Sequence, residues 1–110
     1  MNNVQLVGRL VYQPEIKETE TGTKFLNFRL AVQRNDKAKT TDFINCQAWG
    51  QTAEFICNYF SKGDPIDICG KLQTKNYEKK DGTKVNELFV YVTEVSFVPG
   101  KAANNQSYDL

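Results

Sequence analysis

The sequence contains no histidine and only three cysteines, Cys46, Cys57 and Cys69, among its 110 residues. No two thiols stand in a Cys-x-x-Cys arrangement, so the sequence predicts no metal site. An odd number of thiols argues against a disulfide framework, and we expect three small buried apolar side chains instead. The chain also lacks a glycine-rich phosphate loop and a paired acid–base cluster, so we expect neither an enzyme nor a cofactor.

Long apolar runs and a large net charge are missing as well. No apolar stretch approaches the ~20 residues that span a bilayer, and residues 1–5 do not resemble a signal peptide. We therefore expect no membrane partner and a cytoplasmic location, in a bacterium or, for a phage protein, in its host. Lysine and arginine exceed aspartate and glutamate by one, giving a net charge of +1. That charge is too small for bulk electrostatic binding of a nucleic acid, so such binding requires a local patch.

The pattern of apolar residues indicates one all-β domain over residues 1–100, followed by a tail at 101–110 that we expect to be disordered. Alternation predicts strands at 4–12, 24–33, 43–49, 65–77 and 85–98. Helical spacing appears only at 51–60, and Thr21-Gly22 and Asp81-Gly82 mark turns. Three strands, a short helix and two strands is the order of the five-stranded Greek-key OB barrel, in which the helix lies between the third and fourth strands.

The third and fourth predicted strands carry an unusual outer face. Apolar residues such as Ile44, Cys46, Ile68 and Leu72 alternate to the inside, which leaves large aromatic residues interleaved with cations and amides on the outside. Aromatic rings facing water are costly, but rings between lysines and amides are suited to stacking on nucleobases while phosphates are neutralised. The residues on this outer face are Phe43, Asn45, Gln47, Trp49, Lys71, Gln73, Lys75 and Tyr77.

Further cations extend the predicted patch. The loop between the last two strands contains Lys79, Lys80 and Lys84, and this loop is a common contact of OB folds. Arg9, Arg29 and Arg34 are weaker candidates, because a solvated strand position explains each of them equally well. The rings themselves also have a second interpretation, since a loop or a subunit interface can cover them.

Three functions are consistent with these residues. The first is sequence-independent binding of single-stranded DNA, which needs no chemistry. The second is an OB-type module whose rings are buried against a protein partner. The third is an RNA-binding barrel of the cold-shock type, although such domains are shorter and lack the helix at 51–60.

The sequence resembles the single-stranded DNA-binding proteins of bacteria and their phages, most closely those of low-GC Gram-positive bacteria. The resemblance extends to about Gly100. It depends on the segments Asn3–Leu10, Asp42–Cys46 with Trp49, Lys62-Gly63, and Gly70–Tyr77. It implies an OB fold, a homotetramer, and DNA wrapped around the assembly during replication, recombination and repair. The stacking aromatics of the family correspond to Phe43, Trp49 and Tyr77.

The chain departs from this family at two places. A tryptophan that some members carry after the second strand has no aromatic counterpart near Arg34–Asp36. Family members also carry a long linker and a strongly acidic tip, whereas this sequence ends in Ser107-Tyr108-Asp109-Leu110. The resemblance therefore implies weak or absent recruitment of partner proteins through the tail, or a shortened chain.

Overall fold

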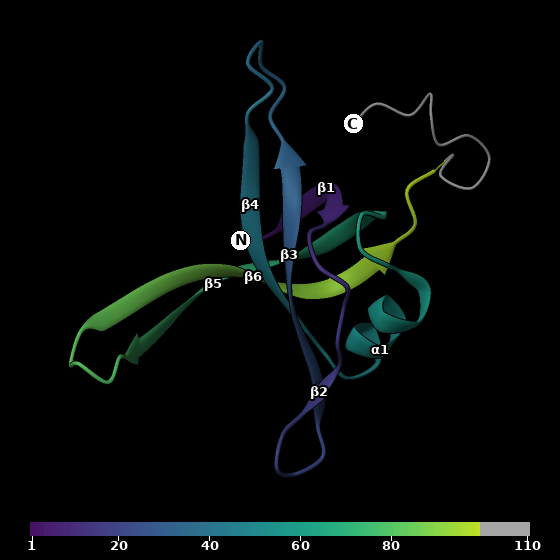
Figure 1. The fold of residues 1–110 in the computed structure, drawn as a ribbon. Helices are drawn as coiled ribbons and strands as arrows, with labels where there is room; N and C mark the ends of the chain where they lie inside the picture. The colour runs from purple at the N-terminus through teal and green to yellow at the C-terminus, as the bar shows by residue number, and fades with distance from the viewer. Residues whose placement is uncertain (100–110) are drawn as a thin grey trace.

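The computed structural model describes residues 1–99, so the predicted tail at 101–110 lies outside the described residues. Seven elements make up the fold (Figure 1), and the predicted elements match six of them with ends displaced by no more than a few residues. The seventh, a two-residue strand, was not predicted. The elements are β1 (Val4–Leu10), β2 (Lys17–Glu18), β3 (Lys24–Gln33), β4 (Thr41–Trp49), α1 (Gly50–Tyr59), β5 (Pro65–Glu78) and β6 (Lys84–Ser96).

The sheet closes into a ring of five strands. Its order is β1-β5-β6-β4-β3, and β1 returns to pair with β3 through Arg9 and Leu10. The short β2 pairs only with β3, outside the ring. The helix follows β4 and precedes β5, which confirms the predicted five-stranded OB architecture.

The predicted third and fourth strands, β4 and β5, are not neighbours. β6 lies between them, antiparallel to β5 and parallel to β4. Alternation in the sequence predicts which face of the sheet a side chain lies on, but not the order of the strands across the sheet. Here the chain leaves β4 through α1, and β5 pairs elsewhere in the sheet. The outer face is consequently built from four strands rather than two.

Inward-pointing residues of the strands and one side of α1 form the core. Ile56 of α1 is fully buried, and Phe60 directly after the helix is almost so. The prediction that Leu72 points into this core was wrong, because it is 45% exposed in the second half of β5, where every residue from Lys71 onward is exposed. Of the three thiols only Cys46 is fully buried, so the burial predicted for Cys57 and Cys69 is only partial. The strand residues of the buried hydrophobic cluster are Leu10, Leu26, Phe28, Leu30, Cys46, Ala48, Ile66, Ile68, Val90 and Val92.

No helix among residues 1–99 is long and apolar enough to cross a membrane. Within the same residues, no group of three or more metal-binding side chains of the usual kinds comes together.

Candidate nucleic-acid interface

Four strands place their outward side chains on one continuous outer face. Residues that pair across strands lie on the same side of a sheet, so the observed register assigns this face directly. β3 and β4 contribute four such pairs, β4 and β6 one, and β6 and β5 a further four. The outer face comprises Phe25, Asn27, Arg29 and Ala31 of β3, Phe43, Asn45, Gln47 and Trp49 of β4, Val85, Glu87, Phe89 and Tyr91 of β6, and Lys71, Gln73, Lys75 and Tyr77 of β5.

The predicted stacking rings all lie on this outer face, and none is sealed inside the subunit. Phe43 is 56% exposed and Tyr77 41% exposed. Trp49 is half-buried because it stacks on Phe25, with ring centroids 5.0 Å apart and planes inclined by 28°. Phe25 therefore holds the indole in place on the outer face.

Hydrogen bonds fix the amide side chains beside Trp49. The indole Nε1 donates to Gln47 Oε1 at 2.9 Å, and Gln47 Nε2 donates to Asn27 Oδ1 at 2.9 Å. In the next row, Arg29 Nε donates to Asn45 Oδ1 at 3.2 Å. The polar groups between the rings are thus pre-oriented across β3 and β4.

The β5–β6 hairpin supplies the opposite side of the outer face. The Tyr77 hydroxyl donates to Glu87 Oε1 at 2.7 Å, and this hydrogen bond raises the pKa of Tyr77 above its usual value. Tyr77 therefore stays a neutral, anchored ring at all ordinary pH values. Lys75 Nζ lies 5.8 Å from the centre of the Phe89 ring, within cation–π range.

A hollow of about 350 Å³ lies between strands β3 and β4 on one side and the β5–β6 hairpin on the other. It falls within the range of ~300–1,000 Å³ typical of small-molecule sites. Predicted residues Asn45 and Lys75 meet there with side chains that the sequence did not single out. The hollow is lined by Asn27, Phe28, Arg29, Asn45, Cys46, Gln47, Lys75, Glu87 and Phe89.

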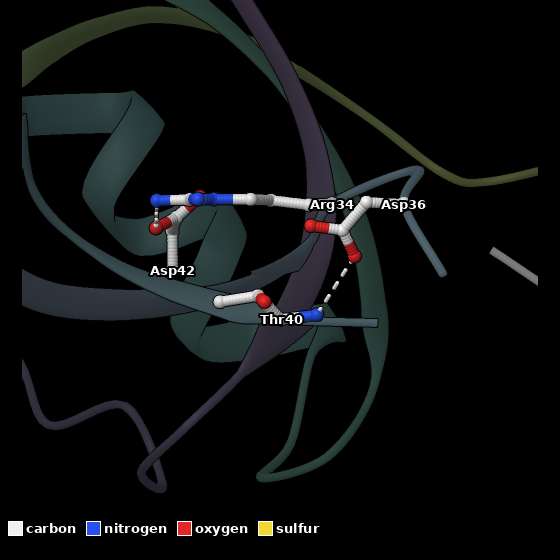
Figure 2. Close-up of polar contacts among 4 residues, drawn as sticks. All are labelled: Arg34, Asp36, Thr40 and Asp42. Atoms are coloured by element: carbon white, nitrogen blue, oxygen red, sulfur yellow. Dashed lines mark hydrogen bonds and ion pairs between the residues drawn. The ribbon is translucent and has the colours of Figure 1, made fainter. Parts of the chain in front are cut away.

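Arg34, directly after β3, has a partner at the start of β4 (Figure 2). Its Nε and Nη2 donate to the two carboxylate oxygens of Asp42 at 2.9 and 3.0 Å. These bonds raise the pKa of Arg34 and lower that of Asp42, so both groups stay charged. Asp36 Oδ1 accepts the Thr40 N–H at 3.1 Å and closes the loop between β3 and β4. The ion pair offsets much of the charge that Arg34 was predicted to offer a phosphate.

The remaining predicted cations are exposed. Arg9 on β1 donates to the Gly63 carbonyl at 3.2 Å, and its backbone pairs with Ala31 of β3. The hairpin loop projects from the barrel (Figure 1) and is closed by the Lys79 N–H on the Thr83 carbonyl at 2.8 Å. Exposed members of the predicted site along this hairpin are Lys71, Gln73, Lys75, Lys79, Lys80 and Lys84.

Sequence reasoning missed the contributions of β6 and of the start of β3. Phe89 and Tyr91 lie next to Val90 and Val92 in a strand that is apolar on both faces, so alternation gave no contrast. Phe25 directly follows Lys24 at the start of β3, where the alternating pattern has only just begun. Cross-strand register with Trp49 is the signal that identifies Phe25, and it exists only in the structure.

A closed five-stranded barrel with exposed rings between amides and cations is the architecture of OB-fold nucleic-acid-binding proteins. A sequence model described as the single-strand binding protein family matches residues 1–98. The chain belongs to that family.

Several curated relatives match most of this chain. The single-stranded DNA-binding protein of Clostridium tetani is 46% identical, across 89% of this chain and 70% of its own length. Single-stranded DNA-binding protein 3 of Clostridium acetobutylicum is 41% identical, across 97% of this chain and 77% of its own. The Enterococcus faecalis single-stranded DNA-binding protein is 42% identical across 86% of this chain, which spans only 50% of that relative.

Proposed function

We propose that this protein binds single-stranded DNA without regard to sequence and coats it during replication, recombination and repair. The observation that carries the proposal is the row of rings on the outer face, with Phe43 and Tyr77 exposed and Trp49 backed by Phe25. Each base has an aromatic face, so such rings stack on any sequence, at about 1–3 kcal/mol per base. Family membership and the names of the relatives support the same function.

In this proposal the DNA strand runs across the outer face. Bases stack on Trp49, Phe43 and Tyr77, while Asn45 and Gln73 contact sugars or base edges. The lysines of β5 and the hairpin loop neutralise phosphates, with Arg9 and Arg34 at the margin. Because stacking supplies much of the affinity, a chain of net charge +1 can bind tightly. Binding of this kind involves no catalysis and no cofactor, and we place it in the cytoplasm of a bacterium or of a phage's host.

Titration with oligo-dT tests this function directly. Trp49 is the only tryptophan, so its fluorescence reports stacking on it without interference. We expect strong quenching that saturates, and a log–log salt dependence with a slope of about −0.7 for each phosphate neutralised. That slope is expected to be modest, and binding should survive moderate salt. The absence of quenching by oligo-dT would contradict the proposal, while oligo-U binding as tightly as oligo-dT would favour an RNA-binding barrel.

We also infer that the protein forms a homo-oligomer, with a tetramer as the expected state. Residues 4–8 of β1 pair with β5 on one side, but among residues 1–99 no strand pairs with them on the other side, where β1 meets β3 only at Arg9 and Leu10. A free strand edge favours pairing with a second copy. Leu72 and Leu88, 45% and 58% exposed, supply apolar surface nearby on the hairpin.

Native mass spectrometry and sedimentation equilibrium test this assembly. The expected mass is four times the 12.5 kDa of one chain. Leu72→Glu with Leu88→Glu should shift the mass toward smaller species, because burying two carboxylates in an apolar interface is costly. A wild-type protein that remains monomeric at micromolar concentration would refute the inference.

A further inference from the structure

The side chain of Asn2 takes the place of a strand beside Leu72. Its Nδ2 donates to the Leu72 carbonyl at 2.8 Å, and its Oδ1 accepts the Leu72 N–H at 2.8 Å. β1 pairs Val4 with Gly70, and the same antiparallel register continued by two residues sets position 2 opposite Leu72. The amide of Asn2 therefore makes the two hydrogen bonds that a paired backbone would make at this position.

Leu72 lies at the base of the β5–β6 hairpin, and this base is held from both edges. Leu72 pairs with Val90 of β6, and Val90 pairs in turn with Cys46 of β4. Among residues 1–99, no strand other than β6 pairs with β5 beyond Gly70, and none other than β5 pairs with β6 before Val90. Beyond the row of Asn2, Leu72, Val90 and Cys46 the hairpin is therefore a two-stranded ribbon, which on its own is only marginally stable in water.

We infer that Asn2 is a positioning residue of the nucleic-acid interface, which fixes the direction of the hairpin and so the distance between Tyr77 and Trp49. Tyr77 lies five residues beyond Leu72, which is about 17 Å along an extended strand. A rotation of about 10° at the base would move a side chain there by roughly 3 Å, a large part of the ~4.5–7 Å between the centres of stacked rings. The inference rests on the proposed binding of single-stranded DNA, and it requires no contact between Asn2 and DNA.

Replacing Asn2 with alanine tests this role. The Leu72 N–H would then have only water as a partner, so its hydrogen exchange, followed by NMR, should become faster. The amides that pair β1 with β5 should exchange as in the wild type, because their partners are unchanged. Affinity for oligo-dT, measured by anisotropy of a labelled oligonucleotide, should fall by about threefold to tenfold, which is the effect of an ordinary hydrogen bond.

Asn3→Ala is the matched control. Asn3 is the next residue in the chain and is also exposed, but its side chain has no hydrogen-bond partner among residues 1–99. Its replacement should leave both the exchange of the Leu72 amide and the affinity for oligo-dT unchanged. Unfolding curves and native masses of both variants, compared with those of the wild type, show whether the fold and the assembly are intact.

A double-mutant cycle separates positioning from a general loss of structure. If Asn2 acts through the hairpin, its replacement should cost less affinity in a Tyr77→Ala background, where the ring to be positioned is already missing. In a Phe43→Ala background the cost should equal that in the wild type, because Phe43 lies on β4, outside the hairpin. We expect the losses of affinity in the two backgrounds to differ by at least about twofold.

The possible outcomes separate this inference from the function on which it rests. If the wild type does not bind oligo-dT, the proposed function fails. If the wild type binds, but Asn2→Ala binds equally well or costs the same affinity in both backgrounds, the positioning role is refuted while the proposed function stands. A smaller native mass for Asn2→Ala than for the wild type would place Asn2 in the assembly of the oligomer and would also overturn the positioning role.

Discussion

Replacing Trp49 with alanine is expected to weaken binding of oligo-dT by about 1–3 kcal/mol for each base that stacks on it, and by more across an oligomer. The indole is half-buried against Phe25 but does not belong to the core cluster. Its removal should therefore cost the fold little. Because the variant has no tryptophan, the measurement is anisotropy of a labelled oligonucleotide, together with thermal unfolding followed by circular dichroism.

Trp49→Phe is the control for this prediction. It keeps a ring against Phe25 but loses the Nε1 hydrogen bond to Gln47, so its affinity should fall between those of the wild type and Trp49→Ala. If Trp49→Ala instead unfolds the protein and leaves the affinity of the remaining folded fraction unchanged, the indole is a structural residue and the stacking role is wrong.

Replacing Gly70 with alanine is expected to destabilise the fold by about 3 kcal/mol or more. Gly70 is buried where β5 and β6 shift register, between Cys69 opposite Glu94 and Gly70 opposite Val92. A methyl group there would overlap the backbone carbonyl of Tyr91, and backbone atoms in a paired strand cannot move aside cheaply. Chemical denaturation gives the free energy of unfolding.

Thr74→Ala, on the same strand, serves as the comparison. Thr74 is exposed on the hairpin, so its loss should change the free energy of unfolding by no more than about 0.5 kcal/mol. A Gly70→Ala protein as stable as Thr74→Ala would mean that β5 and β6 separate easily at the shift. The hairpin would then hold Tyr77 and Lys75 less rigidly than the β5–β6 pairing indicates.

Alternation in the sequence was sufficient to predict most of the elements and the faces of β3 and β4. Leu26, Leu30 and Ala48 are buried as the pattern requires, and Phe43 is exposed. Leu72 follows the same alternation but is exposed, because β5 continues past the end of the barrel. Local pattern specifies which way a side chain points, but not whether anything lies there to cover it.

For the charged side chains too, the sequence predicted exposure but not pairing. Lysines of the hairpin loop are exposed as their composition indicated. Arg34 and Asp42 are eight residues apart in the chain. They pair because β3 and β4 lie side by side, and composition does not reveal that contact.

The sequence by itself determined the class of fold, the outward direction of Phe43, Trp49 and Tyr77, and the need for a local patch in a chain of net charge +1. Each depends on period-two alternation or on composition, which are local properties of the chain. Only the tertiary structure decided that β6 separates β4 from β5, that Phe25 backs Trp49, and that the Gln47 amide links Trp49 to Asn27. Lateral strand order and hydrogen-bond polarity arise from contacts between residues distant in sequence.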